Sequence, residues 1–183
     1  ANRPASLASI IGTEGFQNSL QVTKTWHLRT PENSDLAVID TPAGLTRQEL
    51  ISATRGADAI LIPVMPSDID IHAVMKCISD LLLVAKIPRP DLKIGIIANR
   101  VRANTRVYGQ LKKFLSSLDI PVVATLRDSQ NYTRAFEFGM GIHEMPFSQV
   151  KKDIDAWSDI MGWLDRLRER NLGRPSAIHY LRG

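Results

Sequence analysis

Apolar and polar positions along this chain follow two different periods. Short runs of apolar residues, rich in Val and Ile and without polar alternation, are typical of strands that are buried on both faces of a parallel sheet. Such runs span residues 36–40, 58–64, 93–98 and 121–125. Segments with helical spacing of apolar residues or helical composition lie between and after them, over residues 46–55, 71–85, 105–118, 130–138 and 149–169.

The regular order of strand and helix predicts the fold class. Strands that alternate with helices over short connections form a parallel sheet with helices on both faces. We therefore expect a three-layer, doubly wound α/β fold with a mostly parallel sheet. The 183 residues are enough for one domain with a sizeable core, which we place over residues 1–170, followed by a loosely held tail over residues 171–183.

The first apolar run ends in a carboxylate and a tight turn. Asp40 lies at the carboxyl end of the predicted strand, and Thr41, Pro42, Ala43 and Gly44 follow it. Ligands of open α/β sheets bind at this edge, so a carboxylate there is suited to hold a metal ion or to orient a water molecule. Glycine in the turn lets backbone N–H groups approach a phosphate closely. The motif points to phosphate chemistry, and a buried strand followed by an ordinary turn is the alternative interpretation.

Composition adds little to this picture. The net charge of +4 favours a polyanionic partner, with modest force. The single cysteine, Cys77, excludes an internal disulfide framework and fits a reducing compartment. No apolar run is long enough for a membrane span, and the first residues lack the order of a secretion signal. We therefore expect a cytoplasmic protein that has no membrane partner.

Four motifs, in order along the chain, resemble those of the ParA/MinD family of partition and positioning ATPases, which have a P-loop NTPase fold with a deviant Walker motif. The motifs are VIDTPAG, ADAILIPVMPSDIDIHA, IGIIANRVRANTR and PVVATLRDSQNYTRAFEFGMGIHEM. They extend from Asp35 to Met145 and so cover most of the predicted core. Four concordant motifs are more specific than any one of them alone.

The resemblance implies that the protein binds ATP or ADP together with Mg²⁺. Asp40 matches the Walker B aspartate of the family, which holds the nucleotide magnesium through water. Gly44, with Thr41 and Pro42 in its turn, matches the segment that responds to the γ-phosphate. Asp40 and Gly44 are therefore the candidate catalytic residues, and Thr41 and Pro42 are candidate nucleotide contacts.

The resemblance also implies contacts to the adenine base. Asn99 and Arg100 match the segment after a strand that approaches the adenine, and Leu126, Arg127 and Asp128 match the loop that closes the other side of the base. For two of these residues an ordinary role is an equal alternative. Asn99 is then a cap of its strand end, and Arg127 is a surface charge.

The chain departs from the family in one large respect. Family members begin with a strand, a phosphate-binding loop of the form KGG-x-GK[ST], a helix and a second strand, and no such loop occurs in this sequence. We therefore interpret the chain as the carboxyl-terminal portion of a longer protein, without the first βαβ unit. The missing strand would lie in the middle of the sheet, so we expect its absence to leave the flanking strands with unpaired backbone groups.

The function implied by the resemblance is an ATPase that partitions plasmid or chromosomal DNA or positions another cargo. In the family, ATP joins two subunits into a homodimer that binds nucleoid DNA without sequence preference, and a ParB-like or adaptor protein stimulates hydrolysis. The candidate DNA-binding residues are Arg102, Arg106, Lys112, Lys113, Lys151 and Lys152. A solvated helix surface is the alternative for each of them.

Two other functions remain open at this point. The first alternative is a non-catalytic scaffold or binding module with the same fold. The second is a P-loop relative with a metabolic role. An iron–sulfur carrier of the second kind would be expected to show a Cys-x-x-Cys pair, which this sequence lacks.

Overall fold

Five parallel strands form one sheet in the computed structural model, which describes residues 36–41, 44–86, 93–170 and 176–181. The strands are β1 (Leu36–Thr41), β2 (Ala59–Val64), β3 (Ile94–Val101), β4 (Val122–Arg127) and β5 (Ser176–Leu181). Their order across the sheet is β1-β5-β2-β3-β4, and each pairing is parallel. The predicted α/β class with a parallel sheet is therefore confirmed.

The helices of the described chain fall close to their predicted positions. They are α1 (Arg47–Thr54), α2 (Asp68–Leu83), α3 (Arg106–Ser116), α4 (Gln130–Glu137) and α5 (Phe147–Arg170), with a 3₁₀ helix, η1, at Ile142–Glu144. A hydroxyl side chain caps each of the first four helices by accepting a hydrogen bond from a backbone N–H of the first turn. Helix α2 begins three residues earlier than predicted because Ser67 is its cap.

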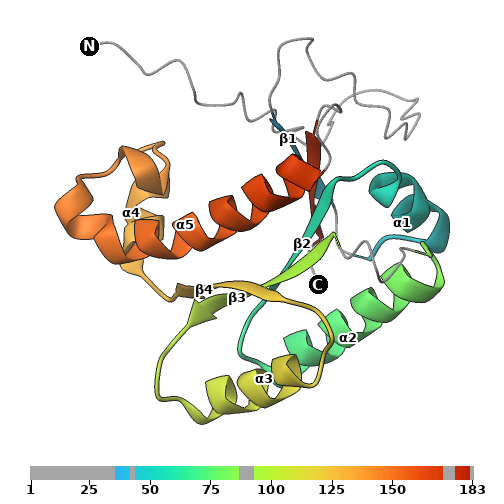
Figure 1. The fold of residues 1–183 in the computed structure, drawn as a ribbon. Coiled ribbons are helices and arrows are strands. Elements are labelled where there is room, and N and C mark those ends of the chain that lie inside the picture. Colours follow the sequence, from blue (N-terminus) through green and yellow to red (C-terminus); the bar gives the residue numbers. More distant parts are fainter. Residues whose placement is uncertain (1–35, 42–43, 87–92, 171–175, 182–183) are drawn as a thin grey trace, which may run out of the picture.

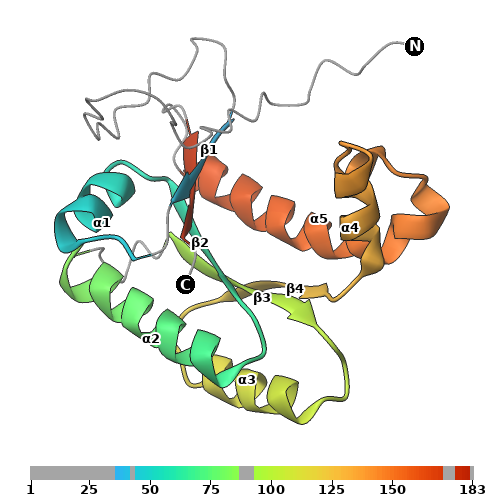
Figure 2. The same ribbon diagram turned by 180° about the vertical axis from the view of Figure 1, so that it is seen from behind.

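Helices cover both faces of the sheet. Helices α1, α2 and α3 lie on one face and α5 lies on the other, as Figures 1 and 2 show from opposite sides. Successive residues of β2 point to opposite faces, so Ile60 and Ile62 pack under the first group of helices whereas Leu61 packs under α5. Both faces of the central strands are therefore buried, as the unbroken apolar runs predicted.

Strand β3 and helix α5 approach closely at Gly95. A Cβ atom on Gly95 would lie 3.1 Å from two ring carbons of Trp163 and would overlap the side chain of Val123. The absence of a side chain therefore lets the indole of Trp163 pack directly on the sheet.

Strand β5 is the element that differs most from expectation. Residues 171–183 were predicted to form a loose tail, but Ser176–Leu181 form a strand between β1 and β2. It pairs with β1 over its whole length and with β2 through residues 178–180. The expectation that the strands beside a missing central strand would have unpaired backbone groups is therefore wrong for β1 and β2, because β5 pairs with both of them.

This arrangement makes the position of β1 depend on β5. Among the described strands, β1 has no partner other than β5, although α1 connects it in sequence to β2. The pairing register sets Asp40 beside Tyr180 and Thr41 beside Leu181. The carboxyl end of β1 therefore joins the ligand-binding edge of the sheet through β5.

Substitution of Ile178 by Pro tests this dependence. Proline removes the backbone N–H and so breaks a ladder hydrogen bond in the centre of the sheet. We expect the free energy of unfolding in urea to fall by about 1–3 kcal/mol, the cost of leaving a buried carbonyl without its donor. Amide exchange of β1 should accelerate in the same variant. The control is Ile178→Thr, which keeps the backbone N–H. Equal urea midpoints of unfolding for the two variants would contradict the position of β5 between β1 and β2.

Candidate functional site

A pocket of about 600 Å³ lies at the carboxyl ends of β2, β3 and β4. All five residues predicted on the base side of a nucleotide line it. Asn99 and Arg100 come from β3, Leu126 and Arg127 come from the end of β4, and Asp128 follows β4. The structure therefore brings these two chain segments together around one space, at the edge where α/β proteins bind ligands.

The other side chains of this pocket are mainly apolar and aromatic. Pro63 and Ile97 line it from the sheet, Tyr132 and Phe136 line it from α4, and Trp157 lines it from α5. The indole Nε1 of Trp157 donates a hydrogen bond of 3.2 Å to the hydroxyl of Tyr132. A space between apolar and aromatic surfaces, with a few polar groups at one end, is suited to a flat heteroaromatic ring.

An irregularity in β3 explains why two consecutive residues line the same pocket. Successive side chains of a regular strand point to opposite faces, but the register of β3 with β4 shifts between Ala98 and Val101. Arg100 has a φ of +51°, the left-handed region that non-glycine residues adopt at a cost of about 1–2 kcal/mol. Its backbone N–H donates to the side-chain oxygen of Asn99 at 3.0 Å, so Asn99 also acts as the local cap that was its alternative role.

Asp128 lies between two arginines at the polar end of the pocket. Its carboxylate accepts a hydrogen bond of 2.7 Å from Nε of Arg102 and lies 3.6 Å from Nε of Arg100. The hydrogen bond from Arg102 is the main cause that lowers the pKa of Asp128. The residue therefore stays an anion, and Arg102, which was a candidate for DNA contact, is held at this pocket.

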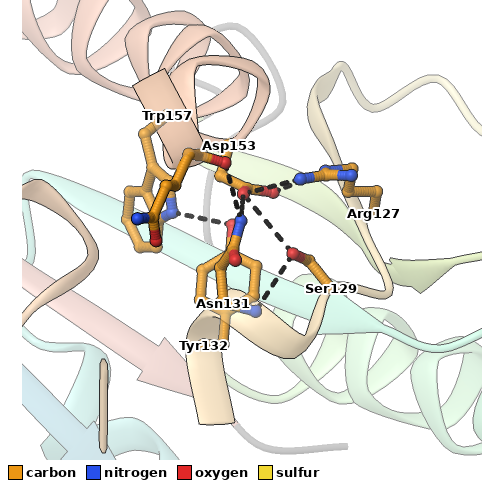
Figure 3. A network of polar contacts seen from close by, with 7 residues as sticks. Arg127, Ser129, Asn131, Tyr132, Asp153 and Trp157 are labelled. Carbon is orange, nitrogen blue, oxygen red and sulfur yellow. Dashed lines mark hydrogen bonds and ion pairs between the residues drawn. The ribbon is translucent and has the colours of Figure 1, made fainter. Parts of the chain in front are cut away.

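A network around one buried carboxylate adjoins the pocket (Figure 3). Asp153 of α5 is fully buried and accepts two hydrogen bonds from Arg127, at 2.6 Å from Nε and 2.8 Å from Nη2. Nδ2 of Asn131 donates to it at 2.7 Å and Oγ of Ser129 at 3.4 Å. Burial would raise the pKa of Asp153, but the hydrogen bonds outweigh burial and the pKa lies below its ordinary value.

Sequence reasoning missed Asp153. Its spacing relative to Val150, Ile160 and Leu167 puts it on the apolar side of α5. A carboxylate on the buried stripe of a helix is the signal that could have identified it. Asp153 also changes the interpretation of Arg127. The guanidinium of Arg127 donates two hydrogen bonds to Asp153, so this residue is not a simple surface charge.

The predicted phosphate-side residues lie at the same edge but outside this pocket. Asp40 is exposed at the end of β1, Thr41 is buried, and Gly44 has a φ of +72° that glycine adopts without strain. Pro42 lies outside the described residues. Because β5 and β2 separate β1 from β3, three strand spacings of about 4.8 Å put β1 roughly 14 Å from β3.

The six candidate DNA-binding residues do not form a single surface. Arg106, Lys112 and Lys113 are exposed on α3, whereas Lys151 and Lys152 are exposed on α5, and these helices cover opposite faces of the sheet. Nζ of Lys112 also lies 4.9 Å from the ring centre of Tyr108. The structure thus divides the basic residues between two separate sides.

Two features of the described residues bear on metal ions and membranes. Within this part of the chain no three His, Cys, Asp or Glu side chains gather in a way that would hold a metal ion. Likewise, no helix among the described ranges has the length and apolar character needed to cross a membrane.

The fold and the pocket define an α/β protein with a pocket at the carboxyl ends of its parallel strands, the edge at which such proteins bind ligands. Among curated proteins, the chain is similar to Maintenance of carboxysome distribution protein A of Halothiobacillus neapolitanus, with 26% identity over 114 residues, or 62% of this chain. The chain spans about half the length of that relative (52%). This similarity confirms the predicted resemblance at the level of a distant relationship to that carboxysome distribution protein. No protein-family model and no solved structure matches this chain.

The lowered pKa of Asp153 predicts how its contribution to stability depends on pH. The contribution is fully present above the unfolded carboxyl pKa of about 3.9 and is lost as the pH falls through the lower folded value. We expect Asp153→Asn to lower the free energy of unfolding by about 1.5–3 kcal/mol near neutral pH, and the difference from wild type to shrink below about pH 4.

Urea unfolding at a series of pH values measures this difference. The control is Asp155→Asn, which removes an exposed carboxylate from the same helix and should leave stability within about 0.5 kcal/mol of wild type. A wild-type advantage over Asp153→Asn that stays constant from about pH 6 to about pH 2 would contradict the buried ion pair.

Proposed function

We propose that this chain forms the base-binding and magnesium-binding sides of a ParA-type ATPase that positions a cargo in the cell. The observation that supports the proposal most directly is the pocket at the ends of β3 and β4. It unites residues of the two sequence motifs that the resemblance assigns to the adenine base. The distant similarity to a carboxysome distribution protein supports cargo positioning as the biological role.

The base of ATP or ADP would lie between the sheet and α4. Its faces would contact Ile97, Leu126 and the aromatic side chains of the pocket, and its polar edge would meet Asn99 and the Asp128 carboxylate. A carboxylate accepts hydrogen bonds only, so it favours an exocyclic amino group such as that of adenine. From there the triphosphate would extend along the sheet edge toward β1.

Asp40 fits a magnesium site of a particular kind. Mg²⁺ prefers oxygen ligands, keeps several water molecules and is held by one or two carboxylates together with substrate phosphates. Asp40 offers an exposed carboxylate at the end of β1. The proposed role is therefore to hold the nucleotide magnesium through water, while Gly44 and its turn adjust to the γ-phosphate.

The proposed ATP-bound form is a homodimer that binds DNA without sequence preference and answers to an adaptor protein. The α3 side is the better candidate for DNA, because it carries Arg106, Lys112 and Lys113 close together in one exposed helix. The basic pair on α5 is separated from them by the sheet. Phosphate contacts of this kind act through counterion release and weaken with salt.

The Asn99→Ala variant tests the base site. We expect the dissociation constant for ADP, measured by titration calorimetry, to rise by about tenfold, which corresponds to the loss of about 1.4 kcal/mol of hydrogen bonding. The control is Gln110→Ala on α3, which is exposed and does not line the pocket. Wild-type affinity in Asn99→Ala would remove this residue from the base site, and failure of the wild-type chain to bind ADP would refute the proposal for this chain.

Charge reversal on the two basic sides tests the DNA surface. The double variants Lys112→Glu/Lys113→Glu and Lys151→Glu/Lys152→Glu change the net charge equally, so any difference between them reports position. We expect the α3 variant to weaken binding to unrelated duplexes alike and to reduce the salt slope by about 2, one unit for each lost phosphate contact. Equal losses from both variants, in fluorescence anisotropy at several salt concentrations, would disprove the assignment to α3.

A further inference from the structure

Asp153 connects three elements that meet beside the pocket. It projects from α5, it binds Arg127 at the end of β4, and it binds Ser129 and Asn131 at the start of α4. The pocket is lined by Arg127, by Ser129 and by Tyr132, which follows Asn131 in the sequence. Asp153 does not line it. The fully buried carboxylate of Asp153 therefore holds Ser129 and Asn131, the residues at the start of α4, in place beside the pocket.

The start of α4 has little else to hold it in place. Ala135 is the only buried residue of this eight-residue helix, so packing constrains it weakly. Ser129 caps the helix by accepting a hydrogen bond from the N–H of Asn131 at 3.2 Å, and the same hydroxyl approaches Asp153. Asn131 also donates to the backbone oxygen of Gln149 at 3.1 Å. The polar contacts in Figure 3, rather than apolar burial, thus fix the position of α4 against α5.

A second contact ties the same two helices together within the pocket itself. The hydrogen bond from Trp157 to Tyr132 joins aromatic side chains that both line the pocket. Trp157 lies one helical turn after Asp153 on α5, and Tyr132 directly follows Asn131 on α4. A shift of α4 caused by the loss of Asp153 would therefore also displace the aromatic side of the pocket.

We infer that Asp153 is a positioning residue of the proposed nucleotide site: it sets the distance between α4 and the sheet, and so the width of the space for the base, without touching the ligand. This inference rests on the proposed function for the identity of the ligand. It gives Arg127 a new role as well, because its guanidinium transmits the position of Asp153 to the end of β4 instead of contacting the base.

The test compares Asp153→Asn with Asp155→Asn by NMR and by ADP titration of the full chain. Asparagine keeps the shape of the side chain but loses the charge that Arg127 and Asn131 bind. We expect the indole N–H resonance of Trp157, assigned with Trp157→Phe, to shift in the ligand-free protein, amide exchange over residues 129–137 to accelerate, and ADP affinity to fall by about tenfold. Asp155→Asn should match wild type in all three measurements.

The outcomes separate this inference from the proposed function. A residue with a merely structural role would lower the unfolding midpoint of Asp153→Asn but leave the indole resonance, the exchange of α4 and the ADP affinity unchanged, which would overturn the inference. Failure of the wild-type chain to bind ADP would instead refute the proposed function, and the ligand-free indole and exchange data would still decide whether Asp153 positions α4. Should Asp153→Asn not fold, Asn131→Ala, which keeps the pair of Arg127 with Asp153, must shift the same signals in the same direction.

Discussion

Parallel pairing of β5 with β1 on one side and β2 on the other is the constraint that brings Asp40 and the pocket to one edge of the sheet. It makes one continuous sheet, so that the carboxyl ends of all five strands share an edge. Within the described chain, β1 is joined to this edge only through β5, which means that the position of Asp40 follows from the last strand. The pocket, in contrast, is built on β2, β3 and β4, whose pairing is direct.

Different interactions position Asp40 at the end of β1 and the residues of the pocket at the ends of β3 and β4. At the end of β1, the position of Asp40 comes from backbone pairing with β5. At the ends of β3 and β4, side-chain interactions dominate, because an irregularity in β3 turns Asn99 and Arg100 to one pocket and a buried carboxylate holds the start of α4. A ligand that extends over three strand spacings, roughly 14 Å, would reach both groups of residues.

Much of this fold could be predicted from the sequence because unbroken apolar runs and capped amphipathic segments are local signals. Strand β5 could not, since the short run Ala177–Leu181 follows Pro175 and does not indicate that it lies inside the sheet, between β1 and β2. For the site, motif order brought Asn99 and Leu126–Asp128 into the prediction. For Asp153, the apolar stripe of α5 is a local signal of burial, but no local pattern identifies its partners, which lie 22–26 positions away in the sequence.

The central claim is that the pocket at the ends of β3 and β4 binds the base of a nucleotide. A crystal structure of this chain grown with ADP and Mg²⁺ tests that claim most directly. The account predicts density for a flat base between Ile97 and Leu126 on one side and Tyr132 and Trp157 on the other, with the phosphates directed toward Asp40. An empty pocket at saturating ADP, or a nucleotide bound elsewhere, would contradict it.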